Sequence, residues 1–428
     1  MNKRNEIKTG YIQTEIGRIP KEWEVVELGT CIDVFSGYAF KREDFLTNKS
    51  KGVPIIKIGN LQNGKVIIDD KTSFVPRDFY EKLFDFQLHY GDVLIALSGA
   101  TTGKIAVVDK DIGLALVNQR VGKFKILNSN ISQKFFYFLA QSDNFKKFVL
   151  RNIGQSAQGN LSPNQVKKSK IPLPPLPEQQ KIAEILRTVD SAIEKVNQAI
   201  ARTERLKKGL MQELLTKGIG HKEFKDTEIG RIPKEWEVVR IKDIGEVFTG
   251  KTPSTSKDSY WNGDIPFITP EDMTGEKYVY RTNRYVSFEG ANQSGKILPP
   301  NTVLVVCIGS TVGKVALTHK ESVTNQQINS VLCKEKVDHD CVYYAISHRS
   351  YMLKNYSGVA AVPIVKKSLF EEFKIPLPQK ITEQQKIAEI LSTVDKRLVL
   401  LRNKKEKMER VKKGLMNDLL TGKRRVKV

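Results

Sequence analysis

Two long stretches of the chain place apolar side chains at the alternating four- and three-residue steps of a coiled-coil seam. The first stretch begins at Ile182 and the second at Ile387, and a polar residue, Thr203 or Lys405, fills one step in each. A pattern of about 38 residues predicts a rod of roughly 57 Å, so each stripe needs a partner helix. We expect the two stripes to pair with each other, and packing of each stripe on its own domain is the alternative. The predicted helix-pairing residues are Ile182, Leu186, Val189, Ile193, Val196, Ile387, Leu391, Val394, Leu398 and Leu401.

Short apolar and β-branched runs outside these stretches predict buried strands in a mixed, turn-rich domain that occurs twice. The strands are expected at 53–58, 92–97, 105–108, 302–308 and 315–318. Amphipathic segments at 132–150 and 338–355 are predicted helices. A proline-rich stretch, 171–177 in one copy and 375–378 in the other, resists helix formation and marks the boundary before each long helix.

The chain contains an internal duplication with shared ends and divergent middles. TEIGRIPKEWEVV at Thr14–Val26 recurs unchanged at Thr227–Val239, and EQQKIAEIL at Glu178–Leu186 recurs at Glu383–Leu391. Between these landmarks the two copies match only loosely. We interpret the shared ends as a common scaffold and the divergent middles as one fold that recognises two different targets.

The predicted fold class is α+β, with two mixed α/β domains in tandem. Each domain is followed by a long helix, and the two helices pair as an antiparallel coiled coil with pseudo-two-fold symmetry. Trp23 and Trp236, in the duplicated opening, are expected to anchor each domain to its helix. The expected boundaries are 1–175 for the first domain, 176–218 for the first helix, 219–378 for the second domain, and 379–428 for the second helix and a basic tail.

The charge balance narrows the possible partners. Lys and Arg total 70 against 48 Asp and Glu, and this formal net charge of +22 favours a polyanion such as nucleic acid. No apolar run approaches a spanning helix and no signal-peptide pattern opens the chain, so we expect a cytoplasmic protein. The four cysteines lack metal-ligand spacing and predict reduced, mostly buried thiols. The basic end, 422–428, is interpreted as a disordered tail that adds nonspecific affinity.

These features together resemble the specificity subunit of type I restriction-modification enzymes, the HsdS family. The resemblance lies in the boundary IPLPPLPEQQKIAEIL at 171–186, the repeated GRIPKEW opening, and the similar helix ends LKKGLMQELLT and VKKGLMNDLLT. It implies that each divergent domain is a target-recognition domain that reads one half of an interrupted, double-stranded DNA site. It implies further that the helices set the spacing and dock methyltransferase subunits, two of them, and that restriction subunits with motor and nuclease activity join for cleavage. S-adenosylmethionine, ATP and Mg²⁺ are then expected on those partner subunits, with no cofactor, metal or catalytic residue on this chain.

Two other classes of function are alternatives to this one. A catalytic DNA methyltransferase or a nuclease would need its own motif, and neither an Asn/Asp-Pro-Pro-Tyr/Phe string nor an adenosylmethionine glycine loop occurs. A coiled-coil scaffold that binds RNA through basic lobes is the other alternative. GATTGK at 99–104 and GSTVGK at 309–314 look like phosphate loops, but the spacing is one residue short and no Ser or Thr follows the lysine. Each is either a strand-to-strand turn or a DNA contact.

Loops that mix glycine, hydroxyl, amide and basic residues are the predicted readers of DNA, because lysines bind phosphates while amides and arginines pair with base edges. A solvated turn, or an amide that satisfies nearby backbone, is the alternative at each position. Gln155, Gln158 and Asn160 correspond to Ala360 and Val362 in the other copy, so these positions could distinguish two half-sites. The predicted DNA contacts are Ser36, Tyr38, Lys41, Arg42, Ser98, Thr101, Thr102, Lys104, Asn118, Gln119, Arg120, Gln155, Gln158 and Asn160 in the first domain, and Lys251, Thr252, Ser254, Ser310, Thr311, Lys314, Asn325, Gln326 and Gln327 in the second.

Overall fold

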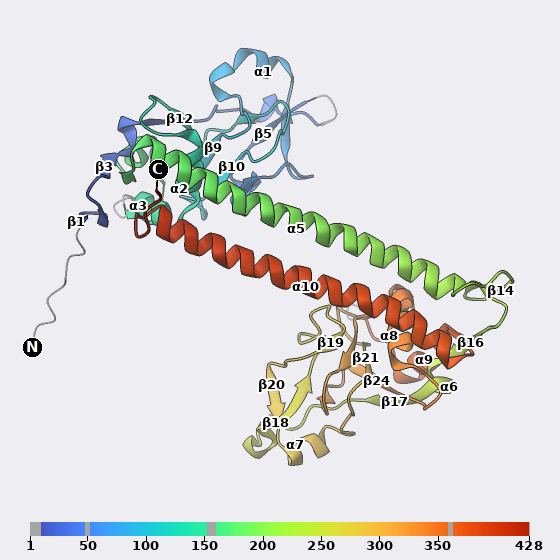
Figure 1. The fold of residues 1–428 in the computed structure, drawn as a ribbon. Helices are drawn as coiled ribbons and strands as arrows, with labels where there is room; N and C mark the ends of the chain where they lie inside the picture. The colour runs from blue at the N-terminus through green and yellow to red at the C-terminus, as the bar shows by residue number, and fades with distance from the viewer. Residues whose placement is uncertain (1–9, 48–51, 152–159, 358–362, 428) are drawn as a thin grey trace, which may run out of the picture. The chain divides into compact units, whose positions relative to one another are not determined.

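The computed structural model describes residues 10–47, 52–151, 160–357 and 363–427, and they form two compact units. Unit 1 contains Met1–Lys195 and Lys405–Val428, and unit 2 contains Val196–Lys404. Each unit therefore combines one mixed α/β head with the start of one long helix and the end of the other (Figure 1). The predicted fold class, two α/β domains each followed by a long helix, with the two helices paired, is confirmed.

Head 1, which runs from β1 to β13, is built around a six-stranded sheet and a three-stranded sheet. The predicted strands at 53–58, 92–97 and 105–108 are confirmed, each within two residues of its expected ends. Their side chains are almost all buried, as expected for apolar runs covered on both faces. In spatial order the larger sheet contains β4 Ile32–Ser36, β12 Val121–Ile126, β9 Val93–Ala96, β10 Ile105–Val107, β7 Lys65–Val66 and β6 Leu61–Gln62, and the smaller contains β11 Leu116–Val117, β5 Val53–Ile56 and β8 Ser73–Val75.

Head 2, which runs from β14 to β25, repeats this plan with one strand fewer. The predicted strands at 302–308 and 315–318 are confirmed. The three-stranded sheet again pairs its central strand with one parallel and one antiparallel neighbour, as in head 1. The five-stranded sheet contains β17 Gly245–Thr249, β24 Ile328–Cys333, β21 Val303–Val306, β22 Val315–Thr318 and β19 Tyr278–Val279, and the three-stranded sheet contains β20 Arg284–Val286, β18 Trp261–Ile268 and β23 Val323–Thr324.

The helical segments of the heads are shorter than the sequence pattern predicts. The segment 132–150 breaks at Ser142, whose backbone is extended and whose hydroxyl accepts a hydrogen bond from Phe145 N at 3.1 Å. The segment 338–355 changes from α-helix to 3-10 helix at Ser350. Hydroxyl side chains that bond to local backbone compete with helix at such positions. The helices are α1 Asp78–Lys82, α2 Gln133–Gln141, α3 Asp143–Arg151 and α4 Pro163–Lys167 in head 1, and α6 Ile241–Ile244, α7 Phe288–Gln293, α8 His339–Arg349 and α9 Lys367–Glu371 in head 2, where the 3-10 segment η7 Ser350–Ser357 follows α8.

The shared ends of the duplication form the base of each head. Each opening folds into a two-stranded hairpin followed by a strand that pairs antiparallel with the proline-rich boundary. Pro172, Pro376 and Pro378 therefore lie in strands, whereas Pro174 and Pro175 form the short junction between β13 and α5. Pro177 lies in the first turn of α5, where a missing N–H costs nothing. These strands are β1 Tyr11–Thr14, β2 Gly17–Pro20, β3 Glu24–Glu27 and β13 Lys170–Leu173 in head 1, and β14 Phe224–Thr227, β15 Gly230–Pro233, β16 Trp236–Arg240 and β25 Lys374–Pro378 in head 2.

The two long helices, α5 Leu176–Lys217 and α10 Ile381–Leu419, lie antiparallel in each unit (Figure 1). In unit 1 the end of α10 packs on the start of α5, and in unit 2 the end of α5 packs on the start of α10. An ion pair joins the helices in each unit, Lys412–Asp190 at 2.7 Å in unit 1 and Lys207–Asp395 at 2.6 Å in unit 2. Of the predicted pairing residues, Val189, Ile193 and Leu401 are half-buried, and the buried ones are Ile182, Leu186, Val196, Ile387, Leu391, Val394 and Leu398.

The duplicated tryptophans hold each head to its long helix, as predicted. Trp23 Nε1 donates to the Glu178 carboxylate at 3.0 Å in the first turn of α5, and Trp236 Nε1 donates to Glu383 at 3.2 Å in the first turn of α10. The interpretation of the basic end as a disordered tail is wrong for Arg425. Its guanidinium binds Glu178 through two nitrogens, at 2.7 and 2.9 Å, because this carboxylate is buried and needs a charge partner.

The cysteines are free thiols, and the prediction that most are buried is confirmed. Cys31, Cys307 and Cys341 are buried and Cys333 is partly exposed. Burial raises the pKa of Cys307 and of Cys333 to about 12, which keeps both thiols protonated. In the described part of the chain, no helix is both long enough and apolar enough to cross a membrane.

Candidate nucleic-acid interface

Three predicted DNA-contact loops leave the same edge of the main sheet in each head. In head 1, β4 ends and β12 begins at this edge, since Ser36 pairs with Gly122, and β9 ends there too, since Ala96 pairs with Val121. The same strands in head 2 bring the corresponding loops together. We name this region the loop edge. It comprises loops 36–42, 98–104 and 118–120 in head 1, and loops 249–254, 309–314 and 325–327 in head 2.

Backbone hydrogen bonds join the loops of head 1 to one another. Tyr38 N donates to Val117 O and Gln119 N donates to Tyr38 O, both at 2.9 Å. Leu97 N donates to Arg120 O, also at 2.9 Å. Residues that lie far apart in sequence are therefore fixed side by side, which a DNA-reading surface requires.

One glycine in each head allows this close approach. A Cβ on Gly37 would lie 2.3 Å from Val117 O, and a Cβ on Gly250 would lie 2.2 Å from Thr324 O. Both distances are far below a van der Waals contact with backbone, which cannot move aside as a flexible side chain can. Glycine at these positions is thus a requirement of the loop packing.

Asn118 and Asn325 are buried and shape their own loops. Asn118 Oδ1 accepts from Arg120 N at 3.3 Å, and Asn325 Oδ1 accepts from Gln327 N at 3.1 Å. The asparagines thus occupy the alternative role, in which an amide satisfies nearby backbone. Gln119, Arg120 and Gln326 are exposed beside them, so base contact by these three remains a prediction.

The glycine turns are strand-to-strand turns, one of the two interpretations that the sequence left open. Gly99 and Gly103 have φ of 86° and 81°, and Gly309 and Gly313 have φ of 100° and 91°. In head 1 a strand follows the turn directly, whereas a nucleotide-binding loop precedes a helix N-terminus. A contact between these turns and DNA phosphates stays a prediction. Exposed residues that could make it are Thr101, Ser310 and Lys314, while Lys104, Thr102 and Thr311 are half-buried.

The hydroxyl of Ser98 stands out in this region. Its Oγ is buried and has no hydrogen-bond partner among the residues that the structure describes. A buried hydroxyl without a partner costs free energy, and contact between Ser98 and DNA stays a prediction. The neighbouring Thr102, by contrast, donates its hydroxyl to Gly99 O at 2.7 Å.

The remaining predicted contacts lie on the first loop of each head or outside the description. Lys41, Arg42, Lys251 and Ser254 are exposed, and Ser36, Tyr38 and Thr252 are half-buried. The Thr252 hydroxyl donates to Gln326 Oε1 at 2.7 Å, which links two loops of head 2. Asn160 is exposed. Gln155, Gln158, Ala360 and Val362 lie outside the described residues.

Two cations beside the loop edge were not predicted from the sequence. Lys57 follows β5, where its Nζ donates to Ser73 Oγ at 2.8 Å and lies 4.0 Å from the Phe45 ring centroid. Arg284 opens β20, with its guanidinium carbon 3.4 Å from the Trp261 ring centroid. Lys57 falls at the end of a predicted strand, which is the only signal that could have found it, and no pattern marks Arg284.

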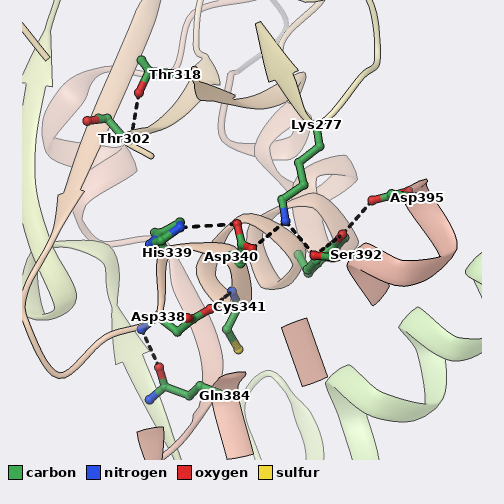
Figure 2. Close-up of polar contacts among 11 residues, drawn as sticks. Lys277, Thr302, Thr318, Asp338, His339, Asp340, Cys341, Gln384, Ser392 and Asp395 are labelled. Carbon is green, nitrogen blue, oxygen red and sulfur yellow. Dashed lines mark hydrogen bonds and ion pairs between the residues drawn. The ribbon is translucent and has the colours of Figure 1, made fainter. Parts of the chain in front are cut away.

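A polar network in unit 2 fixes head 2 to the start of α10. Lys277 Nζ contacts Asp340 on α8 and Ser392 on α10, both at 2.7 Å (Figure 2). Its side chain is 9% exposed, so the ion pair is shielded from water. Tyr344 OH donates to Asp395 on α10 at 2.7 Å. Two parts of head 2, α8 and the segment before β19, are therefore joined to α10.

Comparison with known proteins agrees with this architecture. The sequence matches the family described as the type I restriction modification DNA specificity domain over residues 20–205 and again over 233–410. It is 32% identical to a candidate type I restriction enzyme MjaX specificity subunit of Methanocaldococcus jannaschii, with 97% of each chain covered. It is 28% identical to the type I restriction enzyme MjaVIII specificity subunit of the same organism, covering 96% of this chain and 95% of that protein. The fold is similar to that of a type I restriction-modification S subunit from M. genitalium, with a TM-score of 0.59 at 13% identity over 93% of this chain and 96% of the other.

Proposed function

This chain belongs to the family of type I restriction-modification specificity subunits, and we propose that each of its heads reads one half of an interrupted DNA site. It is a noncatalytic component of the restriction enzyme and carries two target-recognition domains. Our proposal adds the surface that does the reading, which is the loop edge of each head.

The observation that carries this proposal is the equivalence of the two loop edges in backbone and their difference in side chains. Both edges keep a glycine at the close approach and a buried asparagine in the third loop. The exposed and half-buried positions differ between the heads, with Tyr38 where head 2 has Lys251, and Arg120 where head 2 has Gln327. Two domains that recognise different half-sites with one fold require a common backbone arrangement with different exposed polar side chains.

The net charge supports duplex DNA as the ligand. The chain has 70 basic and 48 acidic residues, and this excess of positive charge favours phosphate binding through counterion release. Lys41, Arg42, Lys251 and Lys314 place positive charge on the loop edges themselves. Such lysines would hold the phosphates while the amide side chains contact base edges.

We propose that the paired helices set the spacing of the half-sites and dock two methyltransferase subunits. Helix α5 alone has 42 residues, a length of roughly 63 Å. The helices also expose apolar side chains to solvent, with Leu206 at 54%, Leu400 at 69% and Val411 at 55%. In the proposed complex these side chains lie on the surfaces that the methyltransferase subunits cover.

The proposed complex also contains restriction subunits and lies in the cytoplasm with its DNA substrate. We assign S-adenosylmethionine, ATP and Mg²⁺ to the partner subunits. The glycine turn of head 1 does not fit a nucleotide phosphate, because the strand β10 follows Gly103 and Lys104 directly, where a nucleotide-binding loop continues into a helix.

Reconstitution with the methyltransferase subunit of the same system tests this function. We expect the complex to methylate adenines in one interrupted motif, read by sequencing of the modified DNA, and the chain alone to methylate nothing. Arg120→Ala should change base preference in one half of the motif and Gln326→Ala in the other. Lys125→Ala, an exposed lysine away from the loop edge, is the matched control and should change neither. A continuous motif, methylation by the chain alone, or stronger binding of single-stranded RNA than of the duplex would contradict the proposal.

A further inference from the structure

The three-stranded sheet of each head places one corner directly beside the loop edge. Asn118 N donates to Ile56 O at 3.0 Å, and Asn325 N donates to Ile268 O at 3.1 Å. The residues after these carbonyls, Lys57 and Thr269, therefore lie next to the third loop of the edge. This corner belongs to no loop that the sequence singled out.

Strand register shows which residues of the two corners are equivalent. In head 1, Ile55 on β5 pairs with Ser73 on β8. In head 2, the corresponding Phe267 on β18 pairs with Arg284 on β20. The position of Ser73 in head 1 is thus the position of Arg284 in head 2, just as Lys57 corresponds to Thr269.

In head 1 the cation of this corner comes from the central strand. Lys57 Nζ donates to Ser73 Oγ at 2.8 Å and lies 4.0 Å over the ring of Phe45. Burial lowers the pKa of Lys57, because the ammonium has given up part of its water. Among the residues that the structure describes, no carboxylate contacts Lys57 Nζ.

In head 2 the cation comes from the opposite strand. The guanidinium carbon of Arg284 lies over the Trp261 indole, 3.4 Å from the ring centroid, while Thr269 donates its hydroxyl to Asp272 at 2.8 Å. Trp261 Nε1 donates to Ser254 O at 3.0 Å, so the indole is tied to the first loop of the edge. Within the described chain, no carboxylate contacts the Arg284 guanidinium, whose residue is exposed.

Each corner therefore carries one cation, held over an aromatic ring without an acidic partner. Both heads have a cation over an aromatic ring at this corner. The cation is a lysine after the central strand in head 1 and an arginine on the neighbouring strand in head 2. Stacking on an indole fixes the plane of a guanidinium and so orients its paired N–H donors. A contact with a phosphate needs only charge, whereas a contact with a base edge needs a donor that is held in place, by the Trp261 ring for Arg284 and by the Ser73 hydroxyl for Lys57.

We propose that Arg284 and Lys57 contact bases directly, each donating to the N7 and O6 acceptors of a guanine in the half-site read by its own head. This inference rests on the proposed function and adds the residues that specify a guanine. Guanine offers two adjacent acceptors in the major groove, which match the paired donors of arginine and are also the usual partner of lysine. Ser73 and Trp261 act as positioning residues that aim the two cations.

Binding of duplexes by the reconstituted specificity–methyltransferase complex tests the inference, with each base of the wild-type motif substituted in turn. Arg284→Ala should weaken binding of the cognate duplex about 10- to 100-fold and remove discrimination at one guanine of one half-site. Arg284→Lys should keep the charge and the fold but lose most of that discrimination. Lys57→Ala should act on one guanine of the other half-site.

Substitutions at two other residues, both exposed, are the matched controls, because each also removes one positive charge from its head. Arg281→Ala in head 2 and Lys71→Ala in head 1 should leave base discrimination unchanged. Equal weakening of all duplexes by Arg284→Ala, with a salt dependence reduced by about one phosphate contact, would overturn the inference in favour of a phosphate contact. A wild-type complex that recognises no interrupted motif would instead overturn the proposed function. Urea unfolding of each variant distinguishes lost contacts from lost folding.

Discussion

The contacts that join each head to the two long helices are nearly the same in units 1 and 2, and at one aromatic residue they differ by a single hydroxyl group. In unit 1, Lys412 pairs with Asp190 and lies 5.9 Å from the ring of Phe138. In unit 2, Lys207 pairs with Asp395 and lies 5.9 Å from the ring of Tyr344, which adds a hydroxyl that donates to the same aspartate. The ion pair and its aromatic neighbour have thus been kept, while the number of groups that share the aspartate has changed.

The glutamate at the start of each long helix, buried at Glu178 and half-buried at Glu383, shows the same division. Gln179 and Gln384, which follow the two glutamates, each accept a hydrogen bond from a backbone N–H of their head at 2.8 Å. Glu178, however, is bound by Arg425, whereas Glu383 is bound by His221 at 2.8 Å. The duplication has therefore kept the carboxylate and its tryptophan donor and replaced only the second, basic partner.

The largest expected effect comes from the glycines at the loop edges. Gly37→Ala or Gly250→Ala should destabilise its own unit by about 3 kcal/mol, because the new Cβ meets backbone oxygen at 2.3 or 2.2 Å. Hydrogen exchange of peptides from each unit, combined with urea unfolding, would measure this. Gly59→Ala, where a Cβ meets nothing within 4 Å, is the control and should change stability by less than about 0.5 kcal/mol. A loss shared equally by both units would contradict the separation of the heads.

The interhelical ion pairs should have a moderate effect that differs between the units. Asp395→Asn should cost about 2 kcal/mol, since it weakens the contacts with both Lys207 and Tyr344, and Asp190→Asn should cost about 1 kcal/mol. Double-mutant cycles with the paired lysines would isolate each coupling energy. Glu184→Gln, an exposed position on the same helix as Asp190, should cost little. Equal costs at both aspartates would mean that the Tyr344 hydroxyl contributes nothing.

The smallest effect tests that hydroxyl directly by exchanging the aromatic residues. Tyr344→Phe should cost about 1 kcal/mol, because Asp395 loses a donor at 2.7 Å. Phe138→Tyr places a hydroxyl in the equivalent setting beside Lys412 and Asp190, and should change the stability of unit 1 by less than about 0.5 kcal/mol. Thermal unfolding of the two variants and their combination would decide. A destabilisation by Phe138→Tyr larger than that by Tyr344→Phe would show that the surroundings of the two interhelical ion pairs are less alike than their contacts indicate.

The sequence predicts the long helices, the buried strands and the tryptophan anchors of this protein better than it predicts helix breaks and the contacts of the basic end. The seam beginning at Ile182 and Ile387, the buried strands and the two tryptophans all follow from periodicity or from repetition, which depend on local pattern. The break at Ser142 was missed, since a hydroxyl that bonds to local backbone interrupts a helix without changing its apolar stripe. The basic end was misread because the carboxylate that binds Arg425 lies 247 residues earlier in the chain.

Site residues were harder to find for a similar reason. Asn118 and Gln119 are neighbours in sequence, yet one is buried and the other exposed, and only the fold separates them. Lys57 and Arg284 gain their surroundings from Ser73 and Trp261 through strand pairing. When the neighbours of a side chain are brought to it by the register of strand pairing, the sequence around that residue does not reveal them.

The way in which the chain closes unit 1 has a consequence for its synthesis. Core residues near the start of the chain, such as Ile19, pack in one cluster with Leu419 and Leu420, and Tyr11 contacts Lys423 across 412 positions of sequence. Because these partners are 412 positions apart, a ribosome releases the first of them long before the second. Part of the apolar surface of head 1 therefore stays uncovered until the end of α10 has emerged. Unit 2 spans only Val196–Lys404 and can be completed earlier.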